Sequence, residues 1–182
     1  MSEVSDRYST IADGFTAHLV GVPPDRWSTP SPCTDWVAAD VVAHVINTHR
    51  RVLSTLDGSE PASVASGDDL PGAWSAATAD LLDALNDEVR ASTVIGGMFG
   101  EQPFESLVSR LLCADTLVHT WDLARATGQD EHLDPAGVAK AMEFLGPLDG
   151  AIRRPGGFAP KIEPAAGADE QTRFLNFCGR AV

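Results

Sequence analysis

The chain has 182 residues, of which 43% are apolar and 21% charged, and its formal net charge is −13. This composition is ordinary for a globular protein, and the length suffices for one hydrophobic core without disulfide staples. The acidic balance argues against nucleic-acid binding, because phosphate contacts need a cluster of basic side chains. The chain has no basic run, and Lys140 and Lys161 are its only lysines.

The N-terminal residues MSEVSDRYST are polar and lack the apolar core of a signal peptide. No stretch approaches the roughly 20 apolar residues that span a bilayer, so we expect a cytoplasmic protein without a membrane segment. Cys33, Cys113 and Cys178 are odd in number and widely spaced, which indicates reduced thiols rather than disulfides.

Apolar periodicity predicts helices and no convincing strand. In chain order the predicted helices cover 5–20, from Thr34 or Asp35 to about 56, about 72–91, 104–127, 135–145 and about 169–178. Either Thr34 or Asp35 can cap the second helix, and Gly128 fits the left-handed residue that ends the fourth.

The connections between these helices leave three questions open. Trp27, in the proline-rich loop after the first helix, either anchors that loop or lines a substrate site. Segments 57–71 and 146–168, rich in small residues, either close over the site or extend into solvent, and 95–100 forms either a short extended piece or a wall of the site.

Four principal helices predict an all-α four-helix bundle with additional short C-terminal helices. We expect a single domain over residues 1–182, with a core at about 5–147 and an extension at 148–182. The helix 104–127 lies at its centre, because Leu117 and Trp121 on its back also need cover. A homodimer through an exposed helix face stays open, with Trp74 or Trp121 as candidate contacts.

Three polar residues lie on the apolar stripe of this central helix: Asp115, His119 and Asp122. A buried polar group costs about 1–3 kcal/mol unless it is satisfied, and a carboxylate costs more unless it meets a cation. This face of the helix therefore needs a partner.

The Asp115-x3-His119 spacing lets one helix supply two ligands to one cation. A third ligand then comes from His44 or His49 on the second helix, and helical geometry makes His49 the more buried of the two. Such a set suits zinc, nickel, iron(II) or manganese. The alternative is a structural Asp–His hydrogen bond between helices.

Two motifs, SPCTDWVAADVVAHVINTHRR and LLCADTLVHTWDLARATG, resemble the metal-binding domain of the mycothiol-dependent maleylpyruvate isomerase family, within the DinB-like bundle superfamily. The resemblance implies a divalent metal, zinc or nickel, held by His44, Asp115 and His119. Asp122 would then orient a ligand or cap a helix. The acidic ligand of the isomerase is glutamate, so Asp115 is one methylene shorter.

The resemblance also implies that mycothiol or another low-molecular-weight thiol approaches the metal and attacks a small electrophilic substrate as its thiolate. The isomerase carries a further C-terminal domain for which 182 residues leave no room, so we expect a related transferase or isomerase-like activity. Arg51, and also Arg110 or Arg125, are candidates for binding an anionic substrate. The alternative is a non-catalytic metal- or ligand-binding bundle acting as a sensor or binding module.

Overall fold

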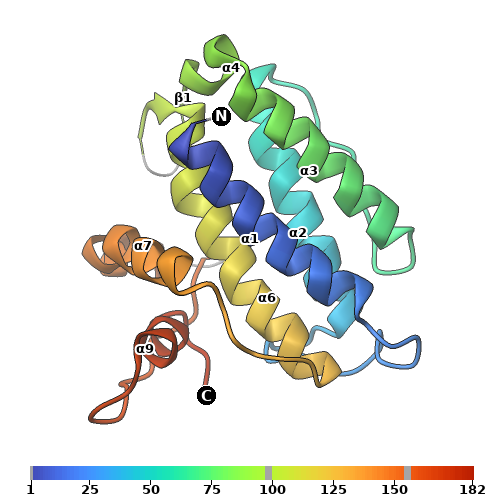
Figure 1. Cartoon of the computed structure of the whole chain (residues 1–182), viewed down its shortest axis with the longest axis vertical. Coiled ribbons are helices and arrows are strands. Elements are labelled where there is room, and N and C mark those ends of the chain that lie inside the picture. The colour runs from blue at the N-terminus through green and yellow to red at the C-terminus, as the bar shows by residue number, and fades with distance from the viewer. Residues whose placement is uncertain (1, 97–99, 154–156) are drawn as a thin grey trace.

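The computed structural model describes residues 2–96, 100–153 and 157–182, and its frame is a bundle of four helices. These are α1 (Glu3–Val20), α2 (Ala38–Leu53), α3 (Leu70–Asn86) and α6 (Cys113–Thr127). They lie side by side (Figure 1), with α1 and α2 each packed against both α3 and α6. This arrangement confirms the predicted all-α, DinB-like bundle.

Short polar side chains begin these helices where the chain needs acceptors for free N–H groups. The Ser2 hydroxyl accepts from the Ser5 N–H at the start of α1, and the Asp69 carboxylate accepts from the Gly72 N–H at the start of α3. At the other end of α6, Gly128 takes the expected left-handed conformation, with φ of 75°.

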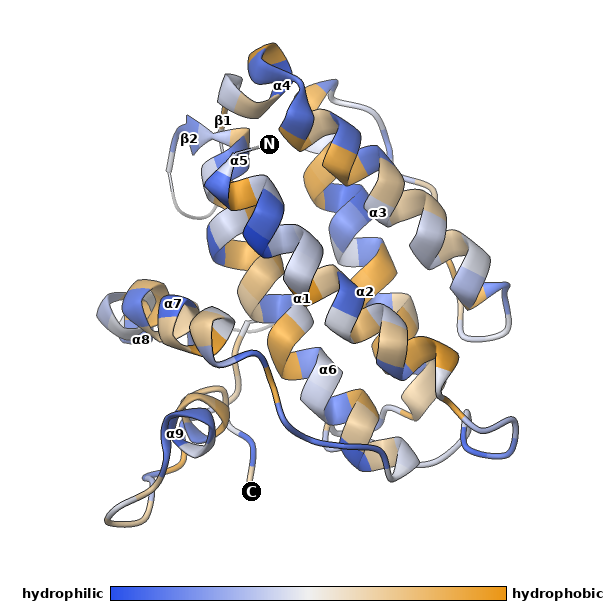
Figure 2. Cartoon of the chain, viewed as in Figure 1, coloured by the Kyte–Doolittle hydropathy of each residue, from blue (hydrophilic) through white to orange (hydrophobic). Residues whose placement is uncertain are grey.

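The bundle helices carry hydrophobic and hydrophilic residues on different sides (Figure 2), as amphipathic helices around one core should. The core includes large side chains that are almost fully buried, among them Trp74 and Trp121, each 1% exposed. The prediction that Trp74 or Trp121 provides an exposed dimer contact is therefore wrong, because both side chains are buried.

The second helix begins later than predicted. Neither Thr34 nor Asp35 caps it: α2 starts at Ala38, and the Asp40 carboxylate accepts a hydrogen bond from the Val37 N–H at 3.0 Å. Asp35 has a left-handed φ of 66°, within a loop that is closed by a bridge between Pro30 and Val37. The helix ends at Leu53 and continues as a 3₁₀ turn, η1 (Ser54–Leu56).

The predicted third helix is divided in two by Asp87. Its carboxylate accepts from the N–H groups of Val89 and Arg90 and so caps a new helix, α4 (Glu88–Ser92). A small antiparallel pair follows, β1 (Val94–Ile95) with β2 (Gln102–Pro103). Two residues per strand are too few for an alternating apolar pattern, so periodicity predicts no strand here, although a short extended piece was left open for 95–100. Residues 97–99 of the segment left open there lie outside the described residues.

The predicted helix 104–127 is continuous in space but not uniform. It begins as α5 (Phe104–Leu107), widens into a π-helical turn, η2 (Val108–Leu112), and continues as α6. A π turn accommodates one more residue than an α turn and is frequent at functional sites. It shifts the residues before α6 relative to the Asp115 face, and Leu111, which regular helical spacing would place close to Asp115 on that face, is only half-buried.

A short helix, α7 (Pro135–Leu145), covers the back of α6, as predicted. Three more short helical elements follow it: η3 (Gly146–Leu148), α8 (Asp149–Ile152) and α9 (Glu170–Phe177). α7 packs against α6 at Gly137, where an added Cβ would lie only 3.1 Å from Leu117. α9 packs against α7 in turn, and both lie to one side of the bundle (Figure 1). Segment 146–168, expected to be a loop, thus contains η3 and α8.

Within the described ranges, no helix combines the length and apolar character needed to cross a bilayer.

Candidate metal site

The structure brings His44 of α2 together with Asp115 and His119 of α6. Asp115 Oδ1 lies 3.5 Å from His44 Nε2 and 3.7 Å from His119 Nε2. The two imidazole rings meet edge to face, with their centroids 4.7 Å apart. One potential ligand atom from each residue lies within 4.8 Å of the other two.

These separations suit a shared cation better than direct hydrogen bonds. Hydrogen bonds from N–H to O have a typical length of about 2.9–3.0 Å, and a contact of 3.6 Å no longer counts as one. Two ligand atoms bound to one tetrahedral ion, at about 2.0–2.1 Å each, lie about 3.3–3.4 Å from one another. The three side chains therefore fit a divalent metal between Asp115 Oδ1 and the two Nε2 atoms.

Asp122 and Arg180 fix the orientation of His119. The Asp122 carboxylate, fully buried, lies 2.9 Å from His119 Nδ1 through Oδ2. Arg180 donates to the same carboxylate from Nε at 2.8 Å and from Nη2 at 2.7 Å. With its Nδ1 proton directed at Asp122, the imidazole points Nε2 toward Asp115 and His44, so that loss of the Nε2 proton would present a lone pair to a cation there, as in metal-binding histidines.

His119 and Asp115 each shift the pKa of the other. Burial alone would lower the pKa of this imidazole, but the charge of Asp115 and the contacts with Asp122 and Cys33 outweigh it and raise the pKa to about 10. Burial likewise opposes the ionised form of Asp115, yet the His119 charge holds the pKa of its carboxyl below the usual value. Without a cation the site therefore retains a proton on His119.

His44 opens onto a cleft of about 520 Å³ at the surface. The indole of Trp36 lies 4.8 Å from the His44 ring and 6.1 Å from the His119 ring, measured between centroids, so it forms a wall beside both imidazoles. Val64 and the two residues after it also line the cleft. The site is thus reachable from solvent on the His44 side, where 30% of that side chain is exposed.

The segment 57–71 is attached to this cleft. Asn47 donates from Nδ2 to the Val64 carbonyl at 2.9 Å, and accepts at Oδ1 from the Val64 N–H at 2.8 Å. Arg50 adds a hydrogen bond to the Ala62 carbonyl at 3.0 Å. The question left open for this segment is answered for its middle, which packs along α2 beside the site.

The three candidate arginines have different surroundings. Arg51 lines the same cleft as His44 and donates to Thr48 Oγ1. Arg125 pairs with Glu131 through two hydrogen bonds and covers the Trp121 ring.

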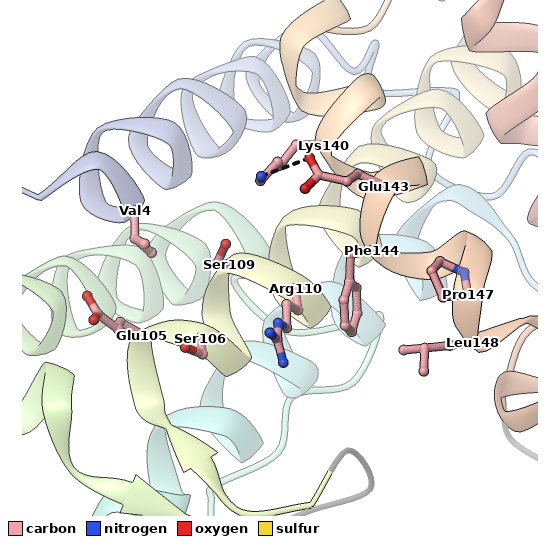
Figure 3. A pocket seen from close by; sticks show the side chains of 10 residues that line it. All are labelled: Val4, Glu105, Ser106, Ser109, Arg110, Lys140, Glu143, Phe144, Pro147 and Leu148. Carbon is pink, nitrogen blue, oxygen red and sulfur yellow. Dashed lines mark hydrogen bonds and ion pairs between the residues drawn. The ribbon is translucent and has the colours of Figure 1, made fainter.

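Arg110 lies in a separate pocket of about 480 Å³, over the Phe144 ring and near the Lys140–Glu143 pair (Figure 3). Of the three arginines, only Arg51 shares the cleft of the candidate metal site.

His49, the alternative third ligand, is 1% exposed, as helical geometry predicted. Its Nδ1 donates to the Val45 carbonyl at 2.8 Å, and its ring meets Trp74 edge to face. Desolvation by burial lowers its pKa to about 4, so the ring is neutral near pH 7. It does not belong to the group of three around Asp115 Oδ1.

Sequence reasoning missed two residues of this environment, Cys33 and Arg180. The Cys33 Sγ lies 3.2 Å from Asp122 Oδ2, 3.2 Å from Arg180 Nη2 and 3.9 Å from His119 Nδ1. The buried Asp122 carboxylate indicates that a positively charged side chain must lie nearby. No spacing rule identifies that side chain as Arg180, which is 58 residues later in the sequence. The Arg180 guanidinium supplies the positive charge between Cys33 and Asp122.

Trp27, which was expected either to anchor its loop or to line a substrate site, is half-buried against the core. Its carbonyl accepts from the Ala39 N–H at 3.0 Å, so it holds the proline-rich loop against the start of α2. It is absent from the described lining of the cleft at His44.

Fold and site together define a helical bundle with a two-histidine, one-carboxylate cluster between two of its long helices. The chain belongs to the family of the mycothiol maleylpyruvate isomerase N-terminal domain, whose model matches residues 8–124, and this confirms the resemblance.

Two relatives come from Mycobacterium tuberculosis: uncharacterized protein MT0763 of strain CDC 1551 / Oshkosh and uncharacterized protein Rv0738 of strain ATCC 25618 / H37Rv. Each is 33% identical over 180 residues, which cover 93% of this chain and 93% of the relative. No solved structure matches the chain.

Proposed function

We propose that the protein binds a divalent metal, zinc or nickel, through His44 Nε2, Asp115 Oδ1 and His119 Nε2. The observation that carries this proposal is the pair of N–O separations, 3.5 and 3.7 Å, which are long for hydrogen bonds and close to those of ligands sharing one ion. The Asp122–His119 contact adds the oriented imidazole that such a site requires.

We further propose a thiol-dependent transferase or isomerase-like activity on a small electrophilic substrate, with mycothiol or a related thiol as the nucleophile. Family membership supports this proposal. A cation at this position would favour the thiolate form of a bound thiol at neutral pH. Trp36 would then limit the approach to one side of the imidazoles, and Arg51 would bind an anionic group of the substrate or thiol. The cleft of about 520 Å³ has the size of small-molecule sites.

A non-catalytic metal- or ligand-binding module is the second candidate. What favours it is the character of the described cleft lining: besides His44, its ionisable groups are Asp35, Asp40 and Arg51. These charged side chains can bind a cationic or anionic ligand, and binding alone requires no proton transfer to a substrate. The two candidates share the metal site and differ in turnover.

We also propose that residues 1–182 form one domain, because the chain after 148 returns to the bundle. α9 packs against α7, which packs against α6, and Arg180 reaches the buried Asp122.

Metal content decides the first proposal. The protein, purified without a histidine tag, is measured by elemental mass spectrometry beside His44→Ala, His119→Ala and the control His132→Ala, whose side chain is 91% exposed. We expect near-stoichiometric metal in the parent and in the control, and its loss in the two site variants. A parent that takes up neither zinc nor nickel when offered would contradict the proposal.

Turnover separates the two candidates. Metal-loaded protein is mixed with mycothiol and a panel of small electrophiles, and loss of free thiol is followed. Conjugation or isomerisation that disappears in His119→Ala supports the enzyme. Stoichiometric metal with no reaction across the panel supports the binding module.

A further inference from the structure

The pocket at Arg110 is a second candidate binding site, and the proposed function makes no use of it. Its volume is about 480 Å³, which lies in the usual range of small-molecule sites. Three parts of the chain that are far apart in the sequence build it: the start of α1, the α5–η2 segment, and α7 with η3 (Figure 3). Its described lining shares no residue with the cleft beside His44, so the two sites are separate.

One wall of this pocket offers several hydrogen-bond donors. Ser106 of α5 and Ser109 and Arg110 of η2 line it together, because residues three or four positions apart lie on one face of a helix. The Ser109 oxygen accepts a hydrogen bond from Arg7, while its hydroxyl proton is donated to no described group. Ser106 forms no side-chain hydrogen bond within the described residues. Both hydroxyls can therefore donate to a ligand.

The Arg110 guanidinium is the charged donor of this wall, and it has no acidic partner among the described residues. Its Nη1 donates to the neutral Gln102 Oε1 at 3.2 Å, and its Cζ lies 5.2 Å from the centre of the Phe144 ring. Two other arginines in the described ranges also lie over an aromatic ring, but each of them pairs with a carboxylate as well: Arg125 with Glu131, and Arg153 with Asp149.

The other charges of the lining leave Arg110 available. Lys140 Nζ pairs with Glu143 Oε2 at 2.8 Å, so these two charges offset one another. Glu105 also lines the pocket, and it forms no ion pair with a described residue. Figure 3 shows Glu105 next to Val4, with Ser106 between it and Arg110. An anion bound at Arg110 would thus meet a guanidinium that no carboxylate of the pocket neutralises.

The wall on the other side of Arg110 is apolar. Phe144 of α7 and Pro147 and Leu148 of η3 gather there (Figure 3). Covering such side chains stabilises a complex by about 25 cal/mol for each Å² of apolar surface removed from water. A ligand that suits both walls has an anionic group for the donors and an apolar body for this side. A carboxylate is the anion whose planar shape matches the guanidinium fork.

We propose that this pocket binds a small carboxylic acid with an apolar aromatic or aliphatic body, in its ionised form. The carboxylate accepts two parallel hydrogen bonds from Nε and Nη2 of Arg110, which have no acceptor among the described residues. The Ser109 hydroxyl donates a third. The hydrocarbon part packs on Phe144 and Leu148. This binding site does not rest on the proposed function.

The first test is a titration of the isotope-labelled, metal-free protein with phenylacetate and with hexanoate, followed through the chemical shifts of its backbone amides. We expect saturable shifts at Ser106, Ser109, Arg110 and Phe144, with a Kd in the millimolar range or below, as is ordinary for so small a ligand. If neither acid shifts these amides, or if the shifts are confined to the cleft beside His44, the proposal is wrong.

Two further probes test the chemistry of recognition. Phenylacetamide has the apolar body without the charge, and inorganic phosphate has a charge without the body. We expect each to bind at least about tenfold more weakly than phenylacetate. An amide that binds as tightly would show that Arg110 does not recognise the anionic group, and phosphate that binds as tightly would show that the apolar wall plays no part; either result would overturn the assigned ligand class.

The third test is a pair of arginine variants. Arg110→Gln removes the charge and the fork from an exposed side chain, and we expect it to weaken phenylacetate binding about 10–100-fold. Arg125→Gln is the matched control, because Arg125 also lies over an aromatic ring but pairs with Glu131, and it should bind as the parent does. An unchanged affinity in Arg110→Gln, or an equal loss in both variants, would contradict the role of Arg110. Because no metal is added, these outcomes do not depend on whether His44 and His119 hold an ion.

Discussion

The ion pair between Arg180 and Asp122 should be among the contacts on which stability depends most. Asp122 is fully buried and receives two hydrogen bonds from the guanidinium, at 2.8 and 2.7 Å. Arg180→Met keeps much of the side-chain volume but leaves a buried carboxylate without its main cation. Breaking such a pair lowers the free energy of unfolding by about 3–5 kcal/mol. Because Asp122 keeps its contact with His119, we expect a loss of about 3 kcal/mol.

For a protein of this size, about 3 kcal/mol corresponds to a fall in Tm of roughly 6–12 °C. Thermal and urea unfolding of the metal-free protein measure the effect. Arg125→Met is the matched control: it also removes an arginine with two hydrogen bonds to a carboxylate, but the side chains of Arg125 and Glu131 are 40% and 35% exposed. We expect the control to cost about 1 kcal/mol, as exposed pairs do.

The double variant Arg180→Met with Asp122→Asn tests the reason for the loss. It removes both charges, and we expect it to be more stable than Arg180→Met alone, because the unpaired buried charge is gone. If Arg180→Met costs less than about 1 kcal/mol, or if the second substitution only adds to the damage, the buried pair does not stabilise the fold as argued.

Three further predictions concern the surroundings of the site. The pKa of His119 is 6.5 as a free side chain and about 10 in the folded protein, so the stability that this group contributes to the metal-free protein should be full below pH 6.5 and be lost as pH rises through 10; unfolding that is independent of pH between 6.5 and 10 would disprove it. Asn47→Ala should accelerate hydrogen exchange at the Val64 amide while α2 stays protected, whereas unchanged exchange would mean that the segment is held otherwise. A disulfide reagent should react first with Cys33, since burial raises the pKa values of the other two thiols to about 11 and about 12; a first reaction that persists in Cys33→Ser would contradict this.

Helical periodicity was sufficient to predict the bundle, because its signal is repeated over several turns in each long segment. It could also place Asp115, His119 and Asp122 on a buried face, since they lie on one regular helix. Boundaries were less predictable where one side chain decides them. Asp40 accepts a hydrogen bond from one backbone N–H group and Asp87 from two, and the sequence offers other residues nearby that could do the same.

The choice between His44 and His49 shows a different limit. Helical geometry ranks them by burial, and His49 is indeed the more buried. Which of them meets Asp115 Oδ1 depends on the relative height of α2 and α6, a tertiary quantity that no local pattern contains. The choice of His44 came from the family resemblance and not from helical periodicity. In the structure His44 Nε2 lies 3.5 Å from Asp115 Oδ1.

Arg180 has a consequence for the order in which the protein is made. It follows Asp122 by 58 residues, so at about 5–20 residues per second a ribosome adds it roughly 3–12 s later. During that interval the nascent bundle has its four long helices but must leave the Asp122 carboxylate hydrated or paired with His119 alone. We therefore expect the nascent chain to close its core in two stages, with the last helical turns and Arg180 completing a bundle that already exists.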